Sequence, residues 1–148
     1  MSLASRALFR LGLRAFEHGW LRGAFGVRWM RLETRGRRSG RAHPVLLDVI
    51  GRDPSSGTIY VQPARGRDAD WFRNVLHDPH VICDSGRGSR PAVAHELAPQ
   101  EAADVLDRWV ASHRRYARFV AKRLGWRGDG SAAAWLASRL PVVAITAD

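Results

Sequence analysis

Apolar and polar residues alternate along several short segments of this chain, and Gly, Pro, Asp or Ser residues bound most of them. Alternation with a period of two is typical of a β-strand that buries one face. It predicts six strands, at residues 27–34, 44–50, 58–62, 80–84, 91–97 and 141–146. Polar turns at residues 51–57 and 85–89 join neighbouring strands by short connections, which favours antiparallel hairpins.

The period lengthens to that of a helix in three further places. Asp68 is a suitable N-cap for a helix at residues 69–77, which ends at Asp78-Pro79 because proline disfavours helical geometry in the residue before it. Pro99 opens a second helix that runs to about residue 124, and residues 131–139 form a third. The second helix carries core positions at helical spacing: Val105, Leu106, Trp109, Val110, His113, Ala117, Val120 and Leu124.

These elements together predict the fold class. Six short strands, with helices inserted mostly late in the chain and no internal repeat, indicate an α+β fold built on a small antiparallel barrel. The length of 148 residues is that of one domain, placed at residues 25–148. Residues 1–24 are predicted to form a basic amphipathic helix that either packs on the domain as a lid or lies in the interface of an anionic membrane.

Charge and cysteine content narrow the possible partners. The chain carries 24 Lys and Arg against 14 Asp and Glu, a net charge of +10, and therefore attracts polyanions: nucleic acid, anionic lipid or a multiply charged cofactor. Cys83 is the single cysteine and lies in an apolar strand-like run, which predicts a buried thiol and a reducing, cytoplasmic compartment. No apolar stretch approaches the ~20 residues that cross a bilayer.

The segment from Arg35 to Arg41 is the strongest candidate for chemistry, since it places four Arg and two Gly between two predicted strands. Glycines allow a tight turn and a close approach of the backbone to a ligand, while guanidinium groups grip phosphate and carboxylate. From these residues alone, an anion clamp and a solvated hairpin turn both stay open.

Several other site classes lack their motifs. The sequence contains no Gly-x-Ser-x-Gly elbow, no phosphate loop and no dinucleotide fingerprint. His77 and His80 lie three apart, but no Cys or acidic cluster completes a ligand set, so no metal is predicted.

Three motifs in order carry a resemblance to a known family. Residues 34–41 read T-R-G-R-R-S-G-R, residues 70–79 read D-W-F-R-N-V-L-H-D-P, and residues 140–143 read L-P-V-V. This order resembles the deazaflavin-dependent nitroreductases, which use coenzyme F420, and in particular their nitroreductase or quinone reductase branch. The resemblance runs from about Thr34 to Ala144.

The resemblance implies a split β-barrel that binds reduced coenzyme F420, an 8-hydroxy-5-deazaflavin whose tail carries a phosphate and several glutamates. It implies that Arg37, Arg38 and Ser39 hold the phosphate and the start of the tail, with Gly36 and Gly40 permitting the approach. Arg41 completes the clamp, and His43, where the family often has Arg, adds a tail contact. The ring is expected to meet the loop Gln62, Pro63, Ala64, Arg65 and Gly66, together with Trp71 and Asn74. That loop lacks the Ser-Lys or Ser-Gly of the family pattern.

The implied chemistry is hydride transfer to an electron-poor acceptor, a quinone or a nitroaromatic. Tyr116 is the candidate for a substrate contact or proton donor, with structural packing as its alternative role. Three other functions compete: a split-barrel carrier of lipid or fatty acid without redox chemistry, a flavin mononucleotide (FMN) enzyme, and a nucleic-acid binder using Arg114, Arg118 and Lys122. Nucleic acid is not expected, because the aromatic residues are not interleaved with the Arg clusters. The oligomeric state stays open.

Overall fold

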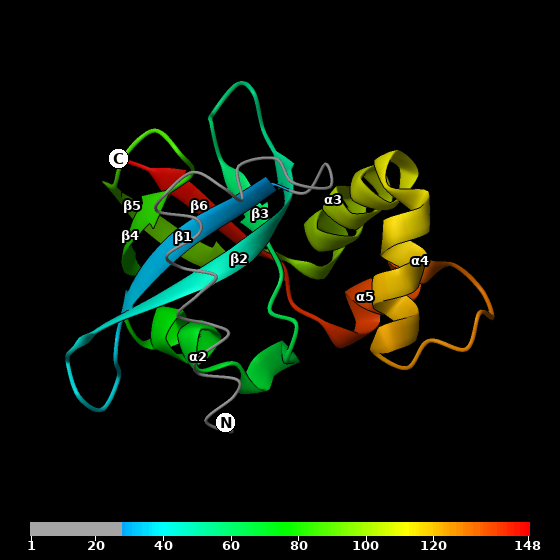
Figure 1. The fold of residues 1–148 in the computed structure, drawn as a ribbon, viewed down its shortest axis with the longest axis horizontal. Coiled ribbons are helices and arrows are strands. Elements are labelled where there is room, and N and C mark those ends of the chain that lie inside the picture. Colours follow the sequence, from blue (N-terminus) through cyan, green and yellow to red (C-terminus); the bar gives the residue numbers. More distant parts are fainter. Residues whose placement is uncertain (1–27) are drawn as a thin grey trace.

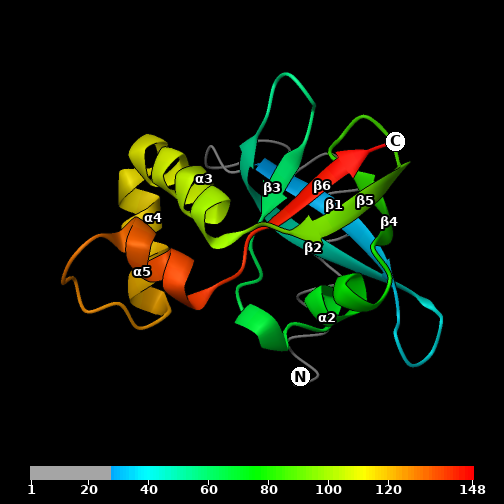
Figure 2. The same cartoon turned by 180° about the vertical axis from the view of Figure 1, so that it is seen from behind.

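The computed structural model describes residues 28–148, so the helix predicted at residues 1–24 lies outside the described residues. Six antiparallel strands close into a barrel in the order β1-β2-β3-β6-β5-β4 (Figures 1 and 2). The strands are β1 (Arg28–Arg35), β2 (Ala42–Arg52), β3 (Ile59–Val61), β4 (His80–Asp84), β5 (Arg90–Glu96) and β6 (Val143–Ala147). The predicted α+β barrel is confirmed.

The pairing of β1 with β2 positions the site described below. The two strands run antiparallel in unbroken register from Arg28↔Val49 to Arg35↔Ala42, and β1 also pairs with β4 to close the barrel. Opposed residues in such a ladder project to the same face. Met30 and Leu32 therefore point inward with Leu47, whereas Trp29 points outward with its partner Asp48.

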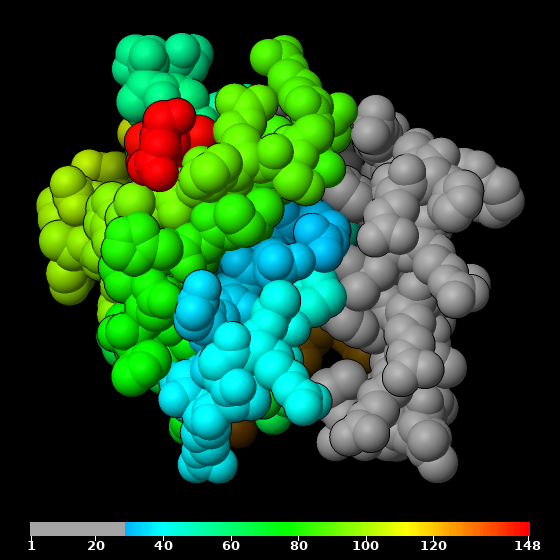
Figure 3. Space-filling model, turned by 90° about the vertical axis from the view of Figure 1, so that its left-hand side faces the viewer, coloured from blue at the N-terminus to red at the C-terminus, as the bar shows by residue number. Residues whose placement is uncertain are grey.

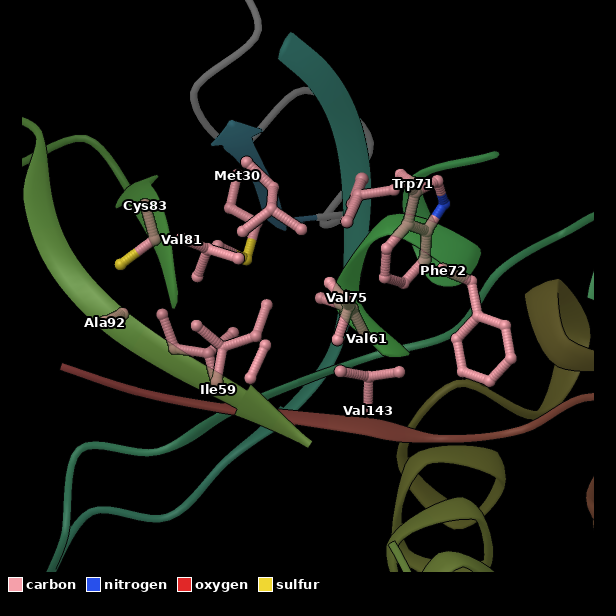
Figure 4. Close-up of a cluster of buried hydrophobic side chains, with 14 of the residues drawn as sticks. Met30, Ile59, Val61, Trp71, Phe72, Val75, Val81, Cys83, Ala92 and Val143 are labelled. Atoms are coloured by element: carbon pink, nitrogen blue, oxygen red, sulfur yellow. The ribbon is translucent and has the colours of Figure 1, made fainter. Parts of the chain in front are cut away.

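The inward face of the barrel forms its hydrophobic core, and Cys83 is buried within it as predicted (Figure 4). Helix α2 (Asp70–His77) covers one end of the barrel, since Trp71, Phe72 and Val75 belong to the same core cluster. Burial raises the pKa of the Cys83 thiol. The core thus fixes α2 and the loop before it against the strands.

The start of α2 corrects the predicted cap. Asp68 lies in a short 3₁₀ helix, η2 (Gly66–Asp68), and its carboxylate pairs with Arg73 instead of capping. Ala69 occupies the N-cap position and makes no side-chain capping bond. Asp70 is the first residue of α2, where its negative charge meets the positive end of the helix dipole. The predicted end at Asp78 is confirmed.

Three helices form a second layer beside the barrel: α3 (Pro99–Ser112), α4 (Arg114–Arg123) and α5 (Ala132–Arg139) (Figures 1 and 2). They enclose a second cluster of buried residues that also contains Ile50 of β2. The predicted continuous helix to residue 124 is wrong, because His113 leaves helical geometry at φ −130° and ψ 40°. Leu124, predicted to be core, is 37% exposed. No helix in the described part of the chain is both long and apolar enough to cross a membrane.

Candidate functional site

A pocket of about 740 Å³ follows β2, and we call it the β2 pocket. One end lies at the β1–β2 turn, and the other lies at Trp29 and Asp48. The remaining walls come from the loop after β3 and the start of α2. The lining residues are Trp29, Gly36, Arg37, Arg38, Ser39, His43, Pro44, Val45, Leu46, Leu47, Asp48, Gln62, Ala64, Arg65, Ala69, Asp70, Trp71 and Asn74. Its volume is within the range of small-molecule sites.

The β1–β2 turn is held by its two glycines. The Gly36 amide donates to the Arg41 carbonyl at 2.8 Å, and the Gly40 amide donates to the Gly36 carbonyl at 2.7 Å. Gly40 has φ 66°, a left-handed conformation that favours glycine. A Cβ at Gly36 would lie 2.6 Å from His43 Nε2 and from Ser39 Oγ, so a larger residue would displace both side chains. The turn projects beyond the barrel (Figure 3).

Arg37 fastens this turn to α2. Its Nη1 donates to Asn74 Oδ1 at 3.0 Å, and its Nη2 donates to Asp70 Oδ1 at 3.1 Å. Its backbone amide also donates to Asn74 Oδ1, at 3.2 Å. The Arg37 guanidinium lowers the pKa of the Asp70 carboxyl by hydrogen bonding, so this carboxyl is ionised at neutral pH.

Asn74 completes the connection from inside the protein. Its side chain is 4% exposed, and its Nδ2 donates to Thr34 Oγ1 at 3.1 Å. Both ends of the amide are therefore engaged, one with β1 and one with the turn. Although Asn74 lines the β2 pocket, its polar atoms hold the pocket together.

The rim beside Arg37 carries the groups that are free for a ligand. Arg38 and Arg65 are exposed, and neither forms an ion pair with another residue of the described range 28–148. Ser39 Oγ and His43 Nε2 lie 3.2 Å apart on the same rim. Two guanidinium groups that have no ion-pair partner among the described residues give this end of the pocket a positive charge.

The loop after β3 turns at Gly66, whose φ of 58° again favours glycine and whose amide donates to the Pro63 carbonyl at 2.8 Å. Gln62 Nε2 donates to the Leu140 carbonyl at 3.2 Å, which ties the loop to the chain before β6. The backbone amides of Ala64 and Arg65 have no partner among the described residues. Both residues line the β2 pocket.

The far end of the pocket holds an acid. Asp48 projects beside its strand partner Trp29, and Tyr116 of α4 donates its hydroxyl hydrogen to Asp48 Oδ2 at 3.1 Å. Asp48 Oδ1 is buried and has no hydrogen-bond partner among the described residues. Burial raises the pKa of Asp48, and burial together with the nearby Asp48 raises the pKa of Tyr116 to about 12.

The structure places most of the predicted site residues in one pocket. Gly36, Arg37, Arg38, Ser39, His43, Gln62, Ala64, Arg65, Trp71 and Asn74 line it. Gly40, Arg41, Pro63 and Gly66 belong to its two loops without lining it, and Tyr116 is hydrogen-bonded to the lining residue Asp48.

Sequence reasoning missed Trp29, Asp70 and the wall from Pro44 to Asp48 as pocket residues. The acid at Asp48 was detectable, since it interrupts an otherwise apolar strand segment, Val45 to Ile50.

The residues present fit the coenzyme that the resemblance implies. Its acidic tail matches Arg38 and Arg65, which form no ion pair within residues 28–148, and the absence of a side chain at Gly36 keeps Ser39 and His43 at the rim. A flat ring system would fit against the apolar wall of the pocket, which consists of Val45, Leu46 and Leu47. This wall leads to the partly polar far end. The pocket therefore combines basic groups at one end with an apolar wall along β2.

Comparison with known proteins gives a consistent result. The family model described as F420H(2)-dependent quinone reductase matches residues 17–123 of the 148-residue chain. A search of curated proteins gave no match. A solved structure of an F420-H2 dependent reductase (FDR-A) shares 22% identity, with 80% of this chain and 93% of that chain covered and a TM-score of 0.55.

Two further solved structures show the same fold. A chain described as a domain-swapped dimer shares 21% identity, with 97% and 99% of the two chains covered and a TM-score of 0.56. An FMN-binding protein related to pyridoxamine 5'-phosphate oxidase, from Nostoc punctiforme, shares 11% identity over 93% of this chain and 78% of its own, with a TM-score of 0.52.

Proposed function

Because this chain belongs to the F420H2-dependent quinone reductase family, we propose that it reduces a quinone with reducing equivalents from coenzyme F420 held in the β2 pocket. The chain is an oxidoreductase, and its cofactor is F420. The observation that supports the proposed site is a pair of guanidinium groups, Arg38 and Arg65, at one end of a pocket with an apolar wall; neither group forms an ion pair in the described part of the chain.

The residues that would hold the cofactor divide into two groups. Arg38 and Arg65 would bind the phosphate and carboxylates of the tail, with Ser39 and His43 beside them. The amides of Ala64 and Arg65, which have no partner in the range 28–148, would donate to the polar edge of the ring, while Trp71 supports the pocket wall. Arg37 and Asn74, which the resemblance implies as direct cofactor contacts, would instead act by fixing the turn.

When bound, the coenzyme supplies a hydride in a two-electron step. The chain contributes no nucleophile to this chemistry. Its residues orient the cofactor by its charged tail and shield the reacting face from water along the apolar wall of β2. Since the tail contacts lie at one end of β2 and Asp48 lies at the other, the acceptor would occupy the Trp29 and Asp48 end.

A quinone is the acceptor that the family assignment supports. Trp29 offers a flat aromatic surface at the far end of the pocket, and Leu46 offers an apolar one. Nitroaromatic compounds share the electron-poor ring and are the second candidate. An FMN enzyme is disfavoured because the shorter, singly phosphorylated tail of FMN would leave part of the basic rim without a partner.

If the acceptor is a quinone dissolved in the membrane, the helix predicted at residues 1–24 would bring the enzyme to its substrate. We propose that its basic face holds the enzyme at an anionic bilayer. Sedimentation with vesicles containing anionic lipid tests this idea on the full chain, with Arg6, Arg10 and Arg14 replaced together by Gln. Equal sedimentation of both proteins would reject the membrane contact without affecting the redox assignment.

The test of the main proposal uses equilibrium and kinetic measurements on the same protein. Fluorescence titration compares the binding of F420 and FMN, and anaerobic mixing follows oxidation of reduced F420 by a 1,4-benzoquinone or a nitrobenzene. Tight binding of F420 and rapid oxidation by the quinone are expected. Binding of F420 without oxidation by either acceptor would overturn the quinone proposal and favour a carrier function.

A further inference from the structure

Helix α4 carries a positive charge that no acidic residue of the helix balances. Half of its ten residues are basic: Arg114, Arg115, Arg118, Lys122 and Arg123. All five are exposed, and none forms an ion pair with another residue of the range 28–148. By contrast, Arg31 and Arg37 each have a carboxylate partner. The proposed cofactor site does not use the charge of α4, since no residue of this helix lines the β2 pocket.

This charge is unfavourable for the helix itself. Arg114 and Arg115 lie in the first turn, beside the positive end of the helix dipole, and that turn has no acidic residue. Arg114, Arg118 and Lys122 follow one another at intervals of four residues, and like charges at this spacing repel one another. A negatively charged surface against α4 would reduce both penalties, so the helix is suited to an anionic partner.

An apolar side chain lies among these charges. Phe119 is 60% exposed and stands two positions from both Ala117 and Ala121, which are fully buried, so it projects from the opposite side of the helix. Its neighbours on the helix surface, three and four positions away, are all basic: Arg115, Lys122 and Arg123. We call Phe119 and these three residues the α4 face.

A lipid surface offers partners for both kinds of side chain. Anionic headgroups attract Lys and Arg, and the boundary between headgroups and acyl chains accepts a Phe side chain. A nucleic acid is matched less well, because proteins that bind single strands use a groove in which several aromatic side chains stack on the bases. The α4 face is the surface of one helix, and Phe119 is its single aromatic residue. The pattern therefore favours the lipid surface.

We propose that the α4 face docks on the surface of an anionic phospholipid bilayer, with Phe119 inserted between the headgroups and its three basic neighbours paired with lipid phosphates. This contact is separate from the one proposed for residues 1–24, and it does not depend on the redox assignment. It would also orient the β2 pocket. Tyr116 of α4 is hydrogen-bonded to Asp48 at the far end of that pocket, and α4 lies on the same side of the molecule as β1 and β2 (Figures 1 and 2). A docked α4 would hold the end proposed for the acceptor near the bilayer.

The experiment measures, by sedimentation, the partitioning of the full chain onto phosphatidylcholine vesicles with and without phosphatidylglycerol. One variant removes the charge of the α4 face through three substitutions made together: Arg115→Gln, Lys122→Gln and Arg123→Gln. Its control removes the same charge at three exposed positions outside α4: Arg52→Gln, Arg87→Gln and Arg90→Gln. Thermal unfolding establishes that each variant is folded.

A second pair of variants tests the apolar side chain. Phe119→Ser is compared with Leu76→Ser, since Leu76 is 56% exposed on α2 and lies outside the α4 face. All four variants are also measured in a chain in which Arg6, Arg10 and Arg14 are replaced by Gln, which separates the contribution of α4 from that of residues 1–24.

Phosphatidylglycerol should strengthen the binding of the wild-type chain. A basic residue near an anionic surface raises the partition coefficient roughly fivefold, so loss of three from the α4 face should weaken binding about 100-fold. Phe119→Ser should weaken it about tenfold. Both controls should stay within about threefold of the wild-type value, because salt screens charges that lie far from the bilayer. The same ratios are expected in the chain that lacks Arg6, Arg10 and Arg14.

Three results would overturn the proposal. Equal vesicle binding by the two triple variants would mean that the net charge, and not α4, attracts the lipid. Equal binding by Phe119→Ser and Leu76→Ser would mean that Phe119 does not enter the bilayer. Loss of affinity for a single-stranded oligonucleotide in the α4 triple variant, with vesicle binding equal to that of its control, would assign α4 to nucleic acid. Vesicle binding needs no cofactor, so these outcomes are independent of whether the chain oxidises reduced F420.

Discussion

Reversing the charge of Arg38 should weaken F420 binding while leaving the fold intact. Arg38 is exposed at the rim of the β2 pocket and forms no ion pair with another described residue. Its neighbour Arg37 has the same side chain but is committed to Asp70 and Asn74. Arg38→Glu should therefore weaken ligand binding without lowering stability, whereas Arg37→Ala should lower both.

The size of the effect follows from the exposure of the rim. A charge-assisted hydrogen bond contributes about 1.5 kcal/mol at the lower end of its range, which suits an exposed guanidinium. A carboxylate placed about 4 Å from the tail adds about 1 kcal/mol of repulsion in a water-like dielectric. The sum of about 2.5 kcal/mol corresponds to roughly 70-fold weaker binding, and a tenfold loss is the minimum expected.

Fluorescence titration of F420 at fixed ionic strength measures this loss, and thermal unfolding measures stability. Arg87→Glu is the matched control, because Arg87 is exposed in the β4–β5 turn and lines neither the β2 pocket nor its loops. The melting temperature of Arg38→Glu should stay within about 1 °C of the wild-type value, as for surface substitutions generally. Arg37→Ala should unfold at a lower temperature.

Two outcomes would refute this reasoning. Unchanged F420 affinity in Arg38→Glu would mean that the guanidinium does not contact the tail. Equal weakening in Arg38→Glu and Arg87→Glu would mean that the overall positive charge, and not the rim, attracts the cofactor.

Three further predictions concern stability and the core. Asn74→Ala removes three hydrogen bonds of a buried side chain and should destabilise the protein by about 2 to 4 kcal/mol in chemical denaturation; a loss below about 0.5 kcal/mol would contradict the role given to Asn74. The raised pKa of Asp48 means that the folded state binds the proton more tightly than the unfolded state, so this carboxyl costs stability as pH rises above its unfolded value of about 3.9. Asp48→Asn should thus be more stable than the wild-type chain at pH 7 and no more stable below about pH 4, and equal unfolding midpoints at pH 7 would contradict the shift. Cys83 should react with iodoacetamide far more slowly in the folded protein than in urea, because its thiol is buried and its pKa is raised; equal rates would show that the barrel opens at this strand.

The barrel was predictable from the sequence because its strands follow a simple alternation. β4 begins and ends at the predicted residues, and Ser131 accepts the Ala134 amide at the start of α5, as its position suggests. The break at His113 was not predictable from periodicity, since both α3 and α4 keep helical spacing across it. The imidazole ring of His113 stacks on the indole ring of Trp109, with 6.1 Å between the ring centroids. This contact depends on the tertiary arrangement.

The site was only half predictable for a related reason. Motif positions such as Arg38 and Trp71 identified the two loops and the helix that meet at the pocket. The roles of the two adjacent arginines differ only because Asp70 and Asn74 approach Arg37 from α2, across 33 and 37 positions of sequence. A sequence pattern weighs both arginines equally, whereas the fold assigns one to structure.

Because Arg37 is bound within the protein while Arg38 is exposed, the turn is suited to binding an anion. An exposed hairpin turn with several arginines would lose conformational entropy on gripping an anion, and that loss would offset much of the binding free energy. Here the Arg37 amide and guanidinium are held by Asn74, and Asn74 is held by Thr34 inside the barrel. The backbone that carries Arg38 is thereby ordered before the ligand arrives, so that mainly the Arg38 side chain must be immobilised on binding. The neutral amide at position 74 can serve both partners, since it accepts from Arg37 and donates to Thr34 at once, which a carboxylate or a lysine could not do.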